Sequence, residues 1–264
     1  MAEPSTLLIT KGHPFDKGAF FNLFDQLPGQ YTHIEQPLAA EVLTARIAAN
    51  YDCLVFYDMP GIEFALGGPK YSDPPDSFKS EFSNMLDQGT GMVFLHHAIA
   101  GWPNWQEYHK IIGGQFLYTA RSSPNGQIMD SGYRHNINHE ISVLDPSHPV
   151  ANGVPQCFSM TDELYLYEVY EEDIEPLLAS NFTFDQKHFY SAAAVVERGE
   201  RFSNSGWSHA PGSALVGWTK QHGQSRICYL QGGDDPTAWA NPHFIQLLSN
   251  AIQWVGAQSP TPEY

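Results

Sequence analysis

Short apolar runs alternate with amphipathic stretches through the first hundred residues, and this rhythm strongly limits the folds open to the chain. The runs LLIT, CLVFY and MVFL are apolar on both faces, while LAAEVLTARIAA and FKSEFSNMLDQG carry apolar residues at helical spacing. Strands of that kind, separated by helices, belong to a mostly parallel sheet that is covered on both faces. The sequence therefore predicts an α/β, flavodoxin-like fold.

The middle of the chain departs from this rhythm. Residues 113–206 are richer in turns, which separate strand-like runs such as INHEISVL and SAAAVVE. The end then returns to the opening pattern with a strand and the helix NPHFIQLLSNAIQWV. We interpret the middle as an antiparallel extension of the same sheet, and we expect a single domain over residues 1–264.

Composition excludes several classes of partner. The chain has 264 residues, 42% of them hydrophobic, and its net charge of −16 comes from 13 basic and 29 acidic residues. Without a basic stripe, neither nucleic acid nor an anionic membrane surface is an expected partner. No apolar run is long enough to span a membrane, and the first residues lack the pattern of a signal peptide. We expect a cytoplasmic protein, and Cys53, Cys157 and Cys228 fit thiols in a reducing compartment better than a disulfide framework.

Polar residues follow four of the apolar runs. His13 follows the first run, Asp58 the second, His96 and His97 the third, and Asp234 the last. In an open parallel sheet, ligands bind beyond the carboxyl ends of the strands. If these strands are neighbours, the polar side chains share one edge of the sheet, which predicts a ligand site there. For Asp58 alone, a helix cap or a loop hydrogen bond is the competing interpretation.

His96 and His97 are adjacent, so a regular strand would point them to opposite faces. Both can enter one pocket only if the chain turns between them. We interpret one as functional and the other as structural, and we favour His96 as the functional one.

The segment YRHNINHEISVLD contains two histidines four residues apart. On a helix, His135 and His139 could share a metal ion, but the alternation of Ile137, His139 and Ile141 is a strand pattern. Four residues of strand span roughly 13 Å, which is too long for one ion. We therefore reject the metal pair and keep His139 as an inward-facing histidine, either in the pocket or in the core.

Adjacent acids and nearby aromatic residues complete the set of candidates. Asp162 and Glu163 precede the run LYLY, which favours carrying one carboxylate toward the interior, although solvated acids at the start of an element are the alternative. Paired acids suit general acid–base chemistry or a hard cation. Aromatic rings such as those of Trp105 and Tyr165, beside carboxylates and imidazoles, are typical of sugar sites, although most such rings are core residues.

Three blocks make the chain similar to the trehalose-utilisation (ThuA-like) family, whose fold resembles that of class I glutamine amidotransferases. They are GMVFLHHAIAGWPNWQEYHKIIGGQF, HPVANGVPQCFSMTDELY and RICYLQGGDDPTAWANPHFIQLLSNAIQWV. In the amidotransferases, the strand that corresponds to MVFL ends in a tight turn that presents a nucleophilic cysteine. This chain has FLHHAIA there, so the resemblance implies that it lacks glutaminase activity and that the turn holds His96 exposed over the pocket.

Two positions depart from the family pattern. The last block usually reads Gly-His-Asp, whereas this chain has Gly233-Asp234-Asp235, and a histidine often found after the GGxF motif is replaced by Tyr118. Both changes weaken a direct transfer of any metal or proton-transfer scheme from the family.

The resemblance implies a carbohydrate-active protein that handles a sugar or a keto-sugar derivative. We assign proton transfer to His96, Asp162 and Glu163. The residues expected to bind the substrate are His13, Asp58, His97, Trp105, His139, Tyr165 and Asp234. The sequence specifies neither the cofactor nor the metal ligands, although a divalent ion held by histidine and aspartate fits the residue types. The reaction could be an isomerisation, an elimination or a hydrolysis, and the chain could form a homo-oligomer. Two non-enzymatic functions are the alternatives: a catalytically silent sugar-binding module and a scaffold subunit.

Overall fold

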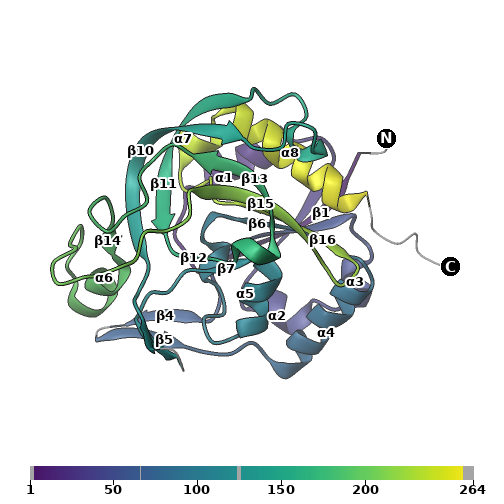
Figure 1. Cartoon of the computed structure of the whole chain (residues 1–264). Helices are drawn as coiled ribbons and strands as arrows, with labels where there is room; N and C mark the ends of the chain where they lie inside the picture. Colours follow the sequence, from purple (N-terminus) through teal and green to yellow (C-terminus); the bar gives the residue numbers. More distant parts are fainter. Residues whose placement is uncertain (1–2, 66, 124–125, 258–264) are drawn as a thin grey trace.

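A single large sheet organises the molecule. The computed structural model describes residues 3–65, 67–123 and 126–257. Within these residues, ten strands form one sheet in the order β11-β10-β13-β15-β16-β6-β3-β1-β2, with β14 paired to β10 (Figure 1). The mostly parallel α/β fold predicted from the alternating apolar runs is confirmed.

The parallel half contains the strands that the apolar runs predicted. Its members are β1 (Ser5–Lys11), β2 (Gln30–Glu35), β3 (Cys53–Asp58), β6 (Gly91–Leu95) and β16 (Ser225–Leu230). Side chains along β6 alternate between two cores, with Val93 and Leu95 on one face and Met92 and Phe94 on the other. The central strands β3 and β6 are buried along their whole length because both faces are covered, whereas β2, at the edge of the sheet, is only partly buried.

Helices cover both faces of the sheet. One face carries α1 (Lys17–Phe24), α7 (Pro236–Trp239) and α8 (Pro242–Gly256). The other carries α2 (Leu38–Val42), α3 (Ala45–Ala48), α4 (Asp76–Asp87) and α5 (Gln106–Ile112). In Figure 1, α7 and α8 lie above the sheet, and α2, α4 and α5 lie below it.

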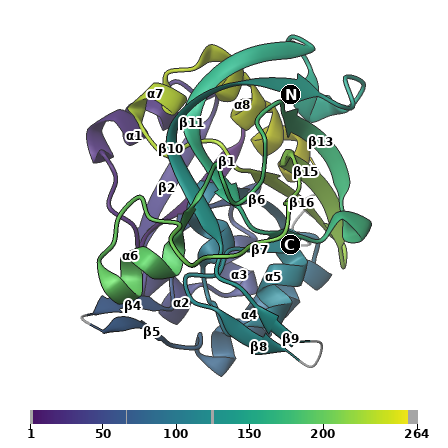
Figure 2. The same cartoon turned by 60° about the vertical axis from the view of Figure 1, so that its left-hand side comes forward.

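The antiparallel extension predicted for the middle of the chain is also confirmed. It contains β10 (Gly132–Val143), β11 (Cys157–Leu166) and β13 (Glu175–Ser180). The strand β15 (Leu215–His222), which lies beyond residues 113–206 and was predicted to follow the opening pattern, is antiparallel as well and joins β13 to β16. The long strands β10 and β11 lie side by side in Figures 1 and 2. This extension places residues of the middle segment beside the ends of the parallel strands.

Smaller elements surround the sheet. They are β4 (Ile62–Ala65), β5 (Gly68–Tyr71), β7 (Gly114–Gln115), β8 (Arg121–Ser123), β9 (Gly126–Ile128), β12 (Glu168–Val169), β14 (Tyr190–Ser191), α6 (Ala192–Arg198) and the 3₁₀ helices η1 (His96–Ala100), η2 (Pro149–Ala151) and η3 (Glu171–Asp173). The β4–β5 hairpin and α6 lie beside each other in Figure 2.

Two local predictions are wrong. The run SAAAVVE, expected as a strand, is the helix α6, because the Ser191 side chain accepts a hydrogen bond from the Ala194 amide and the alanines favour a helix. The stretch LAAEVLTARIAA forms two short helices instead of one. Thr44 separates them, because its side chain caps the second helix by accepting from the Ile47 amide.

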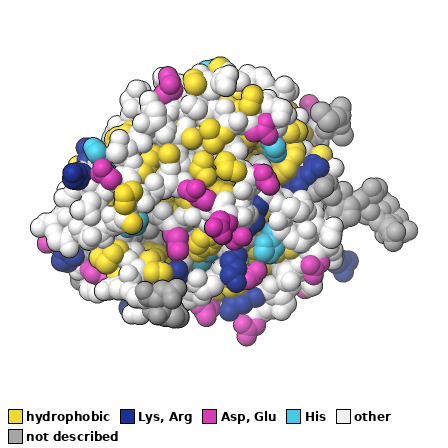
Figure 3. Space-filling view, in the orientation of Figure 1, with side chains coloured by type: hydrophobic (Ala, Val, Ile, Leu, Met, Phe, Trp, Pro, Cys, Tyr) yellow, Lys and Arg dark blue, Asp and Glu magenta, His cyan; other side chains and the backbone are white. Residues whose placement is uncertain are grey.

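The outer surface is of mixed polarity. On the face drawn in Figure 3, acidic side chains are scattered and the basic ones form no continuous stripe. Of the helices in the described part of the chain, none combines the length and the hydropathy that a membrane crossing needs.

Helix α8 packs on the sheet with almost no space between the two backbones. A methyl group added at Gly91 would lie 2.3 Å from the carbonyl oxygen of Val255. The helix covers the sheet with Phe244, Leu247, Leu248, Ala251, Ile252 and Val255, all buried. Gly91 therefore sets how closely α8 approaches β6.

We predict that Gly91→Ala lowers the free energy of unfolding by about 1–3 kcal/mol, because the added methyl forces α8 away from the sheet. Gly18→Ala, in the exposed part of α1, is the matched control and should raise it by up to about 1 kcal/mol, because alanine favours a helix more than glycine does. Urea unfolding monitored by circular dichroism measures both changes. Equal stability of Gly91→Ala and the wild type would contradict the prediction.

Candidate functional site

Four polar residues lie along the carboxyl edge of the parallel strands. His13 follows β1, Asp58 ends β3, His96 follows β6 and Asp234 follows β16. The register pairs Lys11 with Asp58 across β1 and β3, and β6 lies between β3 and β16. The order of the strands thus places these chain positions along one edge.

A tight turn separates His96 from His97. His96 has a φ of 47°, a left-handed conformation that costs a non-glycine residue roughly 1–2 kcal/mol. The hydroxyl of Tyr229 donates to the His96 carbonyl oxygen at 3.0 Å and holds this turn. The turn persists, as the resemblance implied, but it does not expose the ring over a pocket, because His96 is 0% exposed.

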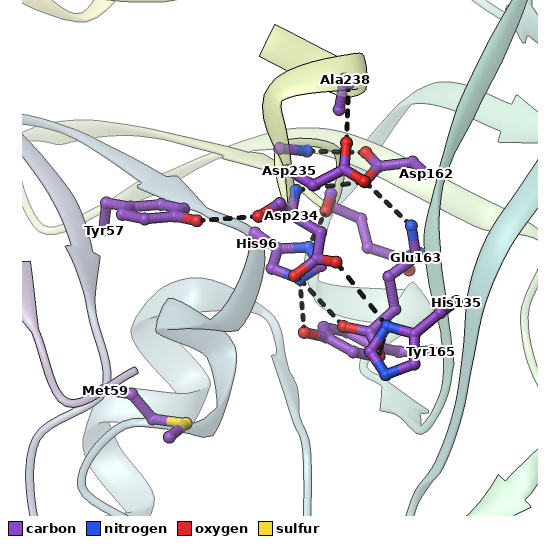
Figure 4. A network of polar contacts seen from close by, with 12 residues as sticks. Tyr57, Met59, His96, His135, Asp162, Glu163, Tyr165, Asp234, Asp235 and Ala238 are labelled. Carbon is purple, nitrogen blue, oxygen red and sulfur yellow. Dashed lines mark hydrogen bonds and ion pairs between the residues drawn. The ribbon is translucent and has the colours of Figure 1, made fainter. Parts of the chain in front are cut away.

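The His96 ring lies among two carboxylates and a phenol (Figure 4). Its Nε2 is 3.1 Å from Glu163 Oε2, 3.3 Å from Asp234 Oδ1 and 2.6 Å from the Tyr165 hydroxyl. Its Nδ1 is 2.7 Å from the Gln231 carbonyl oxygen, so Nδ1 carries a hydrogen and donates it. Both ring nitrogens therefore have fixed partners.

His135 lies on the outer side of the same carboxylates. Its Nδ1 is 3.1 Å from Glu163 Oε1 and 3.7 Å from Asp234 Oδ2, and its side chain is 43% exposed. The sequence pattern suggested His135 only as a partner of His139 and did not predict it at the site. The cause is an irregularity in the pairing of β10 with β11 between Arg134 and Ile137, where Asn136 has a φ of 55°.

This irregularity breaks the alternation that the sequence analysis assumed, so His135 and His139 do not share one environment. The only sequence signal for it was Asn136, since asparagine adopts left-handed conformations more readily than most residues.

Asp162 supports the site from beneath. Its carboxylate accepts hydrogen bonds from the backbone amides of Gly233 at 2.7 Å, Asp234 at 3.1 Å and Glu163 at 2.9 Å. It is 2% exposed and does not line the large cavity described below. Asp162 therefore fixes the backbones that carry Glu163 and Asp234.

Electrostatics link these groups. Burial lowers the pKa of His96, but the hydrogen bonds and charges of Asp234 and Glu163 outweigh burial and raise that pKa well above its ordinary value. The nearby carboxylate of Asp234, with that of Glu163, raises the pKa of His135. Burial raises the pKa of Asp234, but the two imidazoles outweigh burial and lower it. The carboxylates thus create a strong local preference for positive charge.

A large cavity opens above this cluster. Its volume is about 890 Å³, and it lies between the β4–β5 hairpin, β10 and the region of α6. Its polar lining includes His13, His135, Glu163, Glu197, Arg198 and Arg201, and its aromatic lining consists of Phe64, Phe116, Tyr118, Tyr133, Tyr165 and Phe202. Of the acids and histidines in the cluster, Glu163 and His135 are those that reach the cavity, while His96 lies behind them.

Besides Asp234, which contacts His96 and His135, four of the seven predicted substrate-binding residues lie outside the cavity lining. The His97 ring packs between His13 and Tyr57, with ring centroids 4.8 Å and 4.3 Å away. His139 Nδ1 contacts the Ser180 hydroxyl at 2.8 Å, and Trp105 packs against aromatic rings of α4 and α5. Of these three side chains, those of His97 and His139 are buried and that of Trp105 is partly buried.

Asp58 is the fourth of these residues. It is 1% exposed and accepts a hydrogen bond from Gln36 Nε2 at 2.8 Å. The structure therefore gives it the local hydrogen bond that was the competing interpretation. Burial raises the pKa of Asp58 to about 7, and the hydrogen bond from Gln36 only partly opposes that shift.

This raised pKa predicts a pH-dependent stability. Between about pH 4 and pH 7 the unfolded chain releases the Asp58 proton that the folded protein retains, so rising pH favours unfolding. We expect wild-type stability to fall across this window, on the order of a few kcal/mol, relative to Asp58→Asn, which cannot ionise. Urea unfolding at several pH values measures this difference, and parallel curves for the two proteins would refute it.

Comparisons with known proteins agree with this architecture. The model of the trehalose utilisation family, ThuA, matches residues 24–255. A putative ThuA-like protein from Parabacteroides merdae has 16% identity and a TM-score of 0.68, with 99% of this chain and 93% of that chain covered. A putative ThuA-like protein from Bacteroides uniformis also has 16% identity, with a TM-score of 0.60 and coverages of 95% and 90%.

A more distant similarity concerns the fold alone. The structure of PurLQS from Thermotoga maritima has 6% identity and a TM-score of 0.53, with 96% of this chain and 99% of that chain covered. A search of the curated proteins gave no match. With a family model that spans most of its length, the chain belongs to the trehalose-utilisation (ThuA) family, on a fold of the class I glutamine amidotransferase type.

Proposed function

We propose that the protein is an enzyme that binds a sugar or keto-sugar derivative in the large cavity and transfers a proton to or from it by histidine and carboxylate chemistry. The observation that carries the proposal is the arrangement of His135, Glu163 and Tyr165 on the floor of an aromatic-lined cavity. Membership of a trehalose-utilisation family supports a carbohydrate as the ligand.

The cavity suits a carbohydrate in size and in lining. Its volume lies in the range of roughly 300–1,000 Å³ that is typical of small-molecule sites. Aromatic faces cover the C–H surfaces of a sugar ring, while imidazole, carboxylate and hydroxyl groups bind its hydroxyls. Both kinds of group line this cavity.

We assign the proton transfer at the substrate to His135, with Glu163 beside it. The half-exposed imidazole faces the cavity, and the Glu163 and Asp234 carboxylates orient it and stabilise its charged form. His96, first expected as the acid or base, is shielded from the cavity by these groups. In this proposal His96 and Asp162 act as positioning residues.

We expect His135→Asn to lower turnover by roughly 100-fold or more, because asparagine cannot exchange a proton in the useful range. The melting temperature should change little, because the side chain is 43% exposed. His188→Asn is the matched control: it alters an exposed histidine that also contacts a carboxylate, and turnover should not change.

A thermal-shift screen against sugars and keto-sugars identifies the ligand, and chromatography of the reaction mixture then measures turnover. Binding without any turnover would contradict the enzymatic proposal and indicate a silent sugar-binding module. Failure of every sugar and keto-sugar to bind would favour a scaffold subunit.

The proposal also includes the absence of glutaminase activity. The turn after β6 presents His96 where an amidotransferase needs a thiolate. Cys53 and Cys228 are buried within strands, where burial raises the pKa of the Cys53 thiol to about 12 and also raises that of Cys228. Cys157 lies at the start of β11 and not at the turn.

We therefore predict that the protein releases no ammonia from glutamine above the background without enzyme, as measured by a coupled ammonia assay. Iodoacetamide, which should modify the exposed Cys157 first, should leave that background unchanged. Glutamine-dependent ammonia release that alkylation of a single cysteine abolishes would show the prediction to be wrong.

A further inference from the structure

We infer that His96, Glu163 and Asp234 form a binding site for a divalent first-row transition-metal ion such as Zn²⁺, Mn²⁺ or Fe²⁺, beside the cavity that Glu163 lines. One ligand atom from each of the three residues lies within 4.8 Å of the others. The residues come from three separate parts of the fold, namely the end of β6, the strand β11 and the loop after β16. The tertiary structure thus brings together an imidazole and two carboxylates.

The tautomer of His96 supports this site. Nδ1 must donate to the Gln231 carbonyl oxygen at 2.7 Å, so a neutral ring presents the lone pair of Nε2. That lone pair faces carboxylate oxygens of Glu163 and Asp234, and the Tyr165 hydroxyl lies 2.6 Å from Nε2, close enough to serve as a further ligand or as a hydrogen-bond donor to a metal-free ring. Lone pairs on three such atoms repel one another unless a positive charge lies between them.

The distances favour an ion as that charge. Ligand atoms bound to one ion at about 2.0–2.2 Å stand roughly 3–3.5 Å apart. The distances from Nε2 to the two carboxylate oxygens, 3.1 Å and 3.3 Å, are in this range, and all three ligand atoms lie within 4.8 Å of one another. A proton on Nε2 is the competing explanation, but a single N–H aligns well with only one of the surrounding oxygens.

The surroundings of the three ligands resemble the outer shell of a metal site. Gln231 orients the His96 ring through Nδ1, as carbonyl oxygens commonly do for metal-bound histidines. Asp162 holds the backbones of Glu163 and Asp234 through their amides. Figure 4 shows Asp162, Glu163 and Asp234 near the His96 ring, with His135 beside them.

The residue types indicate the class of ion. Imidazole suits zinc and iron, whereas carboxylates also bind manganese. With the ion on His96, Glu163 and Asp234, the half-exposed His135 stays free for the substrate. If the proposed function holds, such an ion supplies a Lewis acid for a sugar carbonyl or hydroxyl oxygen. The metal site itself does not depend on that function, because it is tested without any sugar.

Elemental analysis tests the site directly. The full chain is treated with a chelator, dialysed against Zn²⁺ or Mn²⁺, desalted and measured by plasma mass spectrometry, and Co²⁺ absorption reports the coordination. We expect about one ion per chain and a higher melting temperature with the metal, because an ion that binds only the folded state stabilises it.

His96→Asn and Asp234→Asn should each lower the affinity for the ion by about 100-fold or more, because each removes a ligand atom. His188→Asn removes an exposed histidine 2.8 Å from Asp185 and should leave the affinity unchanged. If His96→Asn fails to fold by circular dichroism, Asp234→Asn alone decides, since Asp234 lies in a loop and is 17% exposed.

The inference is overturned if the wild type retains no ion, or if His96→Asn and Asp234→Asn bind the ion with the same affinity as His188→Asn. It is also overturned if NMR shows a hydrogen on His96 Nε2 in the presence of excess metal. These outcomes are separate from those of the proposed function. Stoichiometric metal without sugar turnover would support the site and contradict the function, whereas turnover that survives complete metal removal, in a protein that retains no ion, would contradict only the site.

Discussion

The site depends on burying two carboxylates and an imidazole together. Glu163 is 6% exposed, Asp234 is 17% exposed and His96 is not exposed at all. Removing a charged group from water costs several kcal/mol unless opposite charges and hydrogen bonds compensate for the lost hydration. Here each group compensates the others, so the loss of any one leaves a buried charge without its partner.

The two halves of the sheet each contribute part of this cluster. The parallel half supplies His96 and Asp234 at strand ends, where chains of this fold class commonly place ligand-binding groups. The antiparallel extension supplies Glu163 and Tyr165 from β11 and His135 from β10. Neither half alone would form the site, and the hydrogen bonds from Asp162 to the loop after β16 join the two.

The turn after β6 shows how one scaffold can serve different chemistry. An amidotransferase uses such a turn to expose a thiolate to its substrate. In this protein the turn keeps a strained backbone at His96 but directs the ring inward, against carboxylates from the extension. The group that faces the cavity is then His135, which lies on an irregular part of β10. The strained turn thus orients a buried group.

The sequence by itself determined the fold class and the edge at which the site lies. Uninterrupted apolar runs specify buried parallel strands, and the residue after such a run must lie at the carboxyl edge, so His96 and Asp234 could be placed from local pattern alone. The tertiary structure alone decided which of the adjacent acids faces the cavity and that His96 is buried. It also decided that His135, and not His139, lines the cavity. Those outcomes depend on strand register, on the irregularity near Asn136 and on packing between distant segments. None of these three can be predicted from the local sequence, because each depends on contacts between residues far apart in the chain.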